Sequence, residues 1–106
     1  MRLSLFSAVA AAALVGLTAS SVHADPNYDV SVSGGKVTVT AHAGWHINLE
    51  FPWKLTVGDT KLDKSRFTLD KAKASVEGAP KGTGQLRGAI CSENTCMPFK
   101  ADVTIK

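Results

Sequence analysis

The stretch Tyr28–Ala41, YDVSVSGGKVTVTA, carries the strongest fold signal in this chain. Apolar and polar residues alternate on both sides of Gly34-Gly35, and every second residue near the turn is a valine. A period of two places these valines on one face of a strand, and a two-residue glycine turn lets two such strands pair as a hairpin. The stretch therefore predicts antiparallel strands at Tyr28–Ser33 and Lys36–Ala41.

Short apolar alternations continue to the carboxyl end of the chain. They predict strands at 46–51, with Ile47, Leu49 and Phe51 on one face, and at 54–57, 66–69, 72–76, 85–90 and 97–105. Pro52, Gly58-Asp59 and the loop 78–82 separate these segments. No segment after residue 24 keeps a helical period. Short strands between glycine and proline turns are typical of an all-β sandwich, so we expect one domain of this class.

The amino-terminal segment has the pattern of a secretory signal peptide. Met1-Arg2 is followed by a nearly uninterrupted apolar run from Leu3 to Leu17, and Val22-His23-Ala24 offers the small residues that a signal peptidase reads. The run is shorter than the ~20 apolar residues of a membrane span. We therefore expect residues 1–24 to be removed and residues 25–106 to form a periplasmic or, alternatively, extracellular protein. An uncleaved anchor is the competing interpretation.

The charge pattern excludes several functions. Twelve basic and nine acidic residues are scattered along the chain rather than clustered, so no basic patch predicts nucleic-acid binding. The sequence has no nucleotide-binding glycine loop and no recognisable hydrolase serine. These observations leave redox exchange, binding and metal transport as the function classes to weigh.

The only two cysteines, Cys91 and Cys96, bracket the polar segment Ser92–Thr95. In a hairpin with a four-residue loop they face each other at a distance that suits a disulfide. Such a short loop makes a weak staple, worth about 2 kcal/mol in the loop-entropy model. An exposed polar tip instead lets a partner thiolate attack a sulfur directly. The position favours exchange chemistry, and a structural bridge stays open as the alternative.

Two groups of residues could modify or replace this chemistry. Trp45 and His46 could tune or shield the cysteines, while Pro98 would stiffen the strand that leaves them. His42 and His46, with a cysteine or Met97, could form a zinc or copper site if the chain turns at Ala43-Gly44. His42 fits a surface position at a strand end better than a ligand position. Trp45 and Trp53 fit core packing better than a recognition patch.

Two motifs resemble the amino-terminal periplasmic domain of DsbD-type thiol:disulfide interchange proteins. They are Gly84–Phe99, GQLRGAICSENTCMPF, and Ala43–Asn48, AGWHIN. With the alternating terminal strand, the resemblance covers most of residues 28–106. It implies an immunoglobulin-like β-sandwich over residues 25–106. It also implies that client proteins oxidise the Cys91/Cys96 pair and a membrane-embedded partner reduces it, without a diffusible cofactor.

The resemblance also implies roles for individual residues. Cys96 is the first contact for a partner, and His46 and Asn48 line the site. The loop 59–66, through Leu62, occupies the position of the family's cap over the cysteines. Phe99 stands where a second proline often follows the Cys-x-Pro element.

The resemblance implies redox partners that lie outside this sequence. Residues 1–106 contain neither a transmembrane electron conduit nor a thioredoxin-like domain. We therefore expect a separate membrane-embedded DsbD-like reductase or thioredoxin-like protein as partner, with periplasmic disulfide-bonded proteins as clients. The competing interpretations are a non-catalytic binding module with a structural disulfide and a copper- or zinc-binding periplasmic protein.

Overall fold

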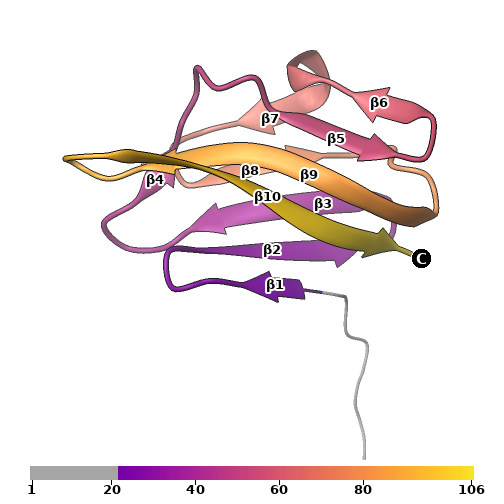
Figure 1. Ribbon diagram of the computed structural model, residues 1–106, viewed down its shortest axis with the longest axis horizontal. Helices are drawn as coiled ribbons and strands as arrows, with labels where there is room; N and C mark the ends of the chain where they lie inside the picture. Colours follow the sequence, from indigo (N-terminus) through magenta and orange to yellow (C-terminus); the bar gives the residue numbers. More distant parts are fainter. Residues whose placement is uncertain (1–21) are drawn as a thin grey trace, which may run out of the picture.

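Two antiparallel sheets form the fold in the computed structural model, which describes residues 22–106 (Figure 1). The first sheet has the strand order β1-β2-β3-β8-β7, and the second has the order β10-β9-β5-β6, with β4 also paired to β9. The strands are β1 Val22–Ala24, β2 Tyr28–Ser33, β3 Lys36–Ala41, β4 His46–Ile47, β5 Lys54–Val57, β6 Thr60–Leu62, β7 Phe67–Leu69, β8 Lys73–Val76, β9 Gly82–Cys91 and β10 Cys96–Ile105. A short 3-10 helix, η2, spans Lys64–Arg66.

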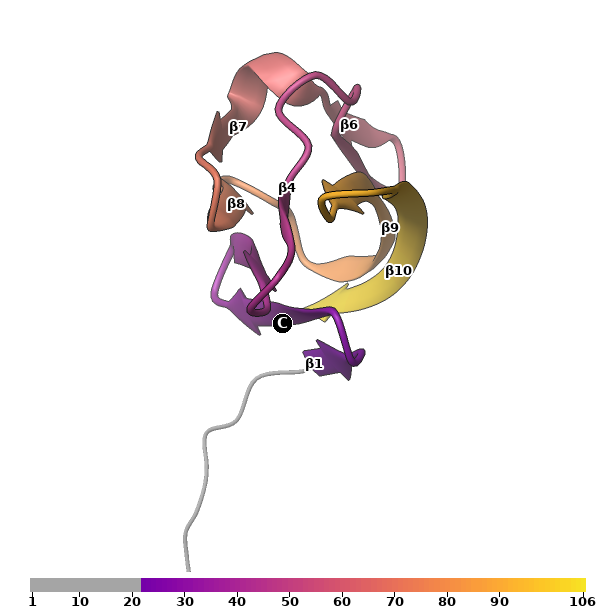
Figure 2. The same ribbon diagram turned by 90° about the vertical axis from the view of Figure 1, so that its left-hand side faces the viewer.

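This strand order is that of an immunoglobulin-like sandwich, which confirms the predicted fold class. The run β2-β3-β8-β7 corresponds to strands A-B-E-D of that fold, and β10-β9-β5-β6 corresponds to G-F-C-C′. Figure 2 shows the two layers facing each other, with the long β9–β10 hairpin curving around one side. The last two strands therefore form the F–G hairpin of the sandwich.

The hairpin at residues 28–41 forms as its alternation predicts. Val30 pairs with Val39 and Val32 pairs with Val37, and all four side chains are buried. Gly34 has φ +59°, a left-handed conformation that glycine adopts without steric cost. The valines of this hairpin thus form one wall of the core.

Aromatic side chains close the core between the two sheets. Trp53 is only 1% exposed and packs directly over Gly88, at which a Cβ would overlap its ring. Tyr28 of β2 stacks on Phe99 of β10 with ring centroids 4.2 Å apart. Burial, with a smaller contribution from the charge of Asp25, raises the pKa of Tyr28 above its usual value. These contacts tie the first sheet to the F–G hairpin.

The strand predicted at 46–51 is wrong beyond Ile47. The Asn48 side chain accepts a hydrogen bond from the Glu50 amide at 2.9 Å, so the chain turns instead of extending. Leu49 is 43% exposed, and Phe51 is only partly buried at the edge of the core. An asparagine side chain that satisfies a backbone amide two residues ahead competes with strand pairing. Ile47, Leu49 and Phe51 therefore do not lie together on one face of a strand.

The ends of the other predicted strands differ by a few residues. The strands β9 and β10 are longer than predicted and reach the cysteines. The strand β6 was not predicted. Arg66, predicted as the first residue of the strand at 66–69, is instead the last residue of η2.

The predicted signal peptide lies almost wholly outside the described residues. Its last three residues, Val22–Ala24, form β1 and pair with Asp29–Ser31 of β2. Cleavage after Ala24 would remove β1 and leave β2 as a sheet edge. Within residues 22–106, no helix has the length and apolar character needed to cross a membrane.

Candidate functional site

The two cysteines form a disulfide across the tip of the β9–β10 hairpin. Cys91 ends β9, Cys96 begins β10, and the two are register partners with Cα atoms 4.0 Å apart. The Ser92 amide donates a hydrogen bond to the Thr95 carbonyl at 2.7 Å, so only Glu93 and Asn94 form the tip. In an antiparallel ladder a hydrogen-bonded pair alternates with a pair whose Cα atoms are closer. The cysteines occupy that closer pair, which brings their sulfurs within bonding distance.

The two halves of the disulfide differ in accessibility. Cys91 lies on the central strand, between β4 and β10, and is 7% exposed. Cys96 lies on the outer strand β10 and is exposed. A thiolate from another protein can therefore approach the Cys96 side of the bond more easily than the Cys91 side.

His46 lies on the other side of Cys91. It is the register partner of Cys91 in β4, and it is exposed on the outer face of the second sheet. His46, Cys91 and Cys96 therefore form one row across three strands, and side chains of such neighbours have Cβ atoms about 4.5–5.5 Å apart. His46 and the two cysteines thus lie next to one another on the same face of the second sheet.

Asn48 and Trp45 have structural roles beside this row. The Asn48 backbone N–H donates a hydrogen bond to the Ala89 carbonyl at 3.0 Å. The Asn48 backbone carbonyl accepts a hydrogen bond from Nε1 of Trp53 at 2.8 Å. The Asn48 side-chain oxygen also accepts a hydrogen bond from the Glu50 amide, so Asn48 anchors the loop that follows β4. Trp45 is partly buried and packs against the core.

The predicted cap is not at the cysteines. Leu62 is buried in the core, where it pairs with Leu55 of β5, and β5 pairs with β9 five residues before Cys91. The segment 59–66 was placed over the cysteines by family resemblance, but the β5–β6 pairing holds Leu62 on the inner face of the sandwich. This assignment of Leu62 to the site is therefore wrong.

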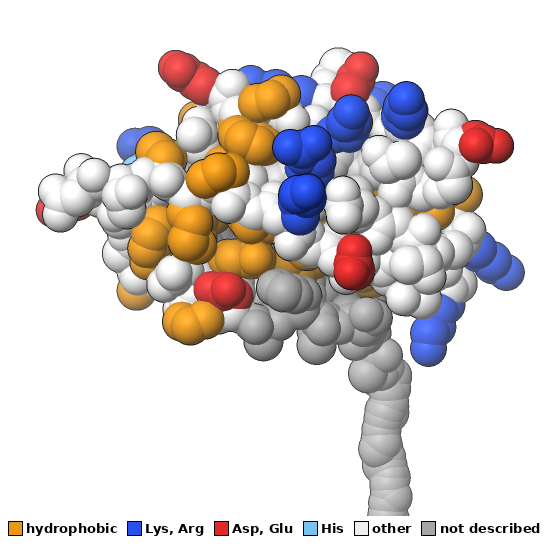
Figure 3. Space-filling view, in the orientation of Figure 1, with side chains coloured by type: hydrophobic (Ala, Val, Ile, Leu, Met, Phe, Trp, Pro, Cys, Tyr) orange, Lys and Arg blue, Asp and Glu red, His pale blue; other side chains and the backbone are white. Residues whose placement is uncertain are grey.

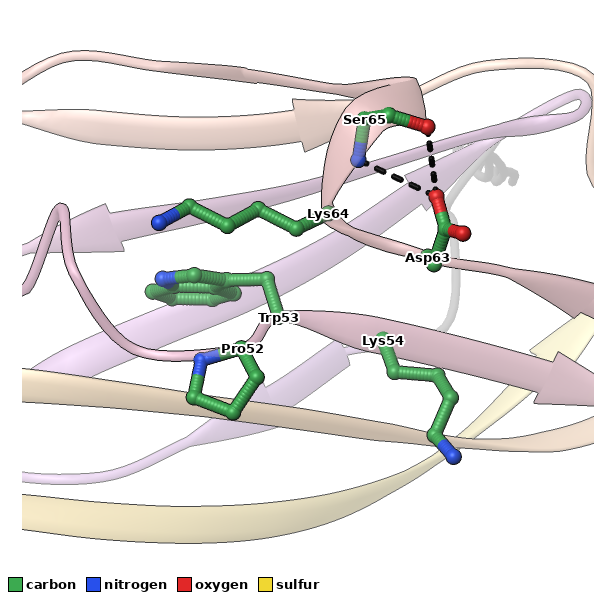
Figure 4. A pocket seen from close by; sticks show the side chains of 6 residues that line it. All are labelled: Pro52, Trp53, Lys54, Asp63, Lys64 and Ser65. Carbon is green, nitrogen blue, oxygen red and sulfur yellow. Dashed lines mark hydrogen bonds between the residues drawn. The ribbon is translucent and has the colours of Figure 1, made fainter.

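Figure 4 shows what the segment after β6 covers instead. A pocket of about 400 Å³ is lined by Pro52, Trp53, Lys54, Asp63, Lys64 and Ser65, and the Lys64 side chain extends alongside the Trp53 ring. Asp63 accepts hydrogen bonds from the amide and hydroxyl of Ser65, which fixes the start of η2. This segment therefore shields Trp53, not the disulfide.

Pro98 and Phe99 follow Cys96 and point to opposite faces. Pro98 is exposed on the outer face, opposite Ala89. Phe99 points inward, between Tyr28 and Trp53, whose rings lie 4.2 and 5.9 Å away. Pro98 therefore belongs to the surface around the disulfide, whereas Phe99 joins that surface to the core.

His42 takes part in a local polar contact. Its Nδ1 lies 2.8 Å from the Pro26 carbonyl, and its Nε2 lies 3.1 Å from a carboxylate oxygen of Asp29. The Pro26 carbonyl first, and then Asp29, raise the pKa of His42 above its usual value. Among residues 22–106, no three or more His, Cys, Asp or Glu side chains form a group that could hold a metal ion. These residues therefore provide no set of ligands for the zinc or copper site considered at His42 and His46.

Sequence reasoning missed a set of surface residues close to this site. Lys54, Arg87 and Lys100 share one row on the outer face of the second sheet, and Phe51 lies beside them. The alternation within β5 and β9 indicated that Lys54 and Arg87 face outward. No local signal indicated that these residues are neighbours, because they come from three segments of the chain.

Comparison with family models, curated proteins and solved structures finds no match to this chain.

Proposed function

We propose that this chain is an exported thiol:disulfide exchange module that works through Cys91 and Cys96 in the manner of the DsbD amino-terminal domain. The observation that supports this most strongly is the position of the disulfide at a hairpin tip, with Cys96 exposed and Cys91 buried. A bond that closes only a four-residue loop contributes little as a staple. Its exposed half is open to the nucleophilic attack that exchange requires.

The exchange begins when a thiolate of a reducing dithiol protein attacks Sγ of Cys96. The new bond joins the partner's sulfur to Cys96, the Cys91–Cys96 bond breaks, and Cys91 leaves as a thiolate. The partner's second thiolate then attacks its own sulfur in the mixed disulfide and releases Cys96. The partner is oxidised by two electrons, and the Cys91/Cys96 pair gains them together with two protons. A client disulfide accepts the same electrons when these steps run in reverse.

His46 fits a supporting role in this sequence. The thiolate that forms on Cys91 lies on a buried central strand, next to the exposed imidazole in the same cross-strand row. Proton donation from His46 would neutralise that leaving thiolate, and proton uptake would regenerate it for the return step. His46 is therefore proposed as a positioning and proton-transfer residue.

The reduction potential of the pair tests the proposal. Equilibration against dithiothreitol or glutathione buffers, followed by thiol alkylation and mass measurement, should give a value of about −120 to −270 mV, the range of exchange catalysts. A value below about −300 mV would mark a structural bridge and favour a non-catalytic binding module.

Single-cysteine variants test the order of attack. Cys91→Ser keeps the exposed Cys96 thiol, and Cys96→Ser keeps the buried Cys91 thiol. We expect the first variant to form mixed disulfides with an aromatic disulfide reagent at least several times faster, because attack requires access to sulfur. Equal rates, or faster reaction of Cys91, would contradict Cys96 as the first contact.

A further inference from the structure

Three cations form one row across the outer face of the second sheet. Arg87 of β9 pairs with Lys54 of β5 on one side and with Lys100 of β10 on the other. Lys54 alternates with the buried residues of β5, and Arg87 and Lys100 are exposed, so all three point away from the core. Adjacent strands lie about 4.8 Å apart, which places the Cα atoms of the three residues within about 10 Å. Figure 3 shows basic side chains gathered over the middle of this face.

Within residues 22–106 the row forms no ion pair. The ion pairs found among residues 22–106 are Lys36–Glu77 and His42–Asp29, neither of which involves the row. The next row on the same face contains Thr56, Gln85 and Asp102, with Lys61 opposite Thr56. Asp63 and Lys64 line a pocket together with Lys54, so five basic groups and two acidic groups lie on or beside these rows. Like charges directly opposite one another destabilise a sheet. The arrangement therefore costs the fold stability and leaves a positive surface available to another molecule.

Two apolar hollows flank this row. One, of about 270 Å³, is lined by Phe51, Arg87, Pro98, Phe99 and Lys100. The other, of about 190 Å³, is lined by Phe51, Pro52, Lys54 and Arg87. Phe51 and Arg87 line both hollows, so the row combines charges with aromatic and proline surface. Such a combination of aromatic residues and arginine is typical of protein-binding surfaces.

We propose that this face is a docking surface for an acidic segment of the redox partner, with carboxylates on Lys54, Arg87 and Lys100 and an apolar side chain beside Phe51. This inference rests on the proposed function and specifies the partner's chemistry. Arg87 lies four residues before Cys91 on the same strand, or about 13 Å away. A segment bound at the row would hold the partner's thiol close to the exposed Cys96.

A protein segment explains the surface better than a nucleic acid does. The row of Lys54, Arg87 and Lys100 is about 10 Å wide and runs across the strands. A bound molecule can therefore place only two or three negative charges against it. A nucleic acid needs an extended basic track, because its affinity comes from many phosphate contacts. A short acidic segment with one apolar side chain matches both the width of the row and the adjoining hollows.

A peptide titration tests the docking surface directly. The probe is the peptide GDEFEDG, acetylated and amidated at its ends, and its control is GNQFQNG with the same blocked ends, which carries no charge. Amide chemical shifts of the purified protein should move on β5, β9 and β10 with the acidic peptide, less so at high salt. The combined Lys54→Gln, Arg87→Gln and Lys100→Gln variant should bind about tenfold more weakly, because three rim ion pairs are lost.

A matched variant separates the row from net charge. Lys71→Gln, Lys73→Gln and Lys81→Gln remove the same charge from exposed positions elsewhere and should change the affinity by less than about twofold. Absence of binding to the native protein, equal losses in both triple variants, equal binding of the neutral peptide, or tighter binding of single-stranded DNA would each overturn the proposal.

The two proposals can fail separately. Reduction of the disulfide by dithiothreitol needs no docking, so its equilibrium should be the same in the native protein and in both triple variants. A structural potential together with peptide binding at the row would reject the exchange function and retain the surface. A reduction potential in the range of exchange catalysts, without peptide binding, would retain the exchange function and reject the docking surface.

Discussion

At the scale of single residues, His42 links the strands at one end of the first sheet through a contact that depends on its charge. The Pro26 carbonyl and Asp29 raise its pKa in the folded protein above the unfolded value of about 6.5. Its stabilising contribution is therefore complete below pH 6.5 and is lost as the pH rises through the folded pKa. We expect His42→Gln to lower the thermal midpoint by a few degrees at pH 5.5 and by much less at pH 8.5, measured by circular dichroism. Asp29→Asn should remove part of the same pH dependence, and a gap between native and His42→Gln midpoints that is constant with pH would contradict this role.

At the scale of elements, β9 carries glycine where the core needs space. Gly88 lies under the Trp53 ring, and an added methyl group would overlap that ring. Overpacking a filled core costs about 1–3 kcal/mol. We therefore expect Gly88→Ala to lower the free energy of unfolding, measured with urea, by about that amount. In a Trp53→Leu background the same alanine should cost clearly less, because contacting residues are not additive. Equal costs in both backgrounds would show that Trp53 is not the cause.

At the scale of the whole molecule, we expect the sandwich to form without its disulfide. The core extends through both sheets, from the valine hairpin to Trp53 and Ile90, whereas the bond closes only the tip of one hairpin. We expect Cys91→Ser combined with Cys96→Ser to lower the free energy of unfolding by about 2 kcal/mol and to leave the strands intact. Urea unfolding and circular dichroism measure both. Global unfolding of this variant at room temperature would show that the disulfide is a major structural element.

Some features of the site could be predicted from the sequence, and others appear only in the whole fold. The cysteine pairing was predictable because Cys91 and Cys96 belong to one hairpin, in which a short loop sets the register. His46 was named from the sequence as a candidate neighbour of the cysteines, but its register with Cys91 could not be predicted, because β4 and β9 are separated by four other strands. No sequence signal indicated that Lys54, Arg87 and Lys100 are neighbours, since they meet only through two separate pairings.

The sequence alone determined the local elements: the hairpin at 28–41, most later strands, the all-β class and the cysteine tip. Alternation acts within a strand, and turn residues act over a few positions, so both can be read locally. Tertiary structure decided which strands pair, and this placed Leu62 in the core and aligned the cations. The physical reason is that register between distant segments depends on packing of the entire core, which no short stretch of sequence contains.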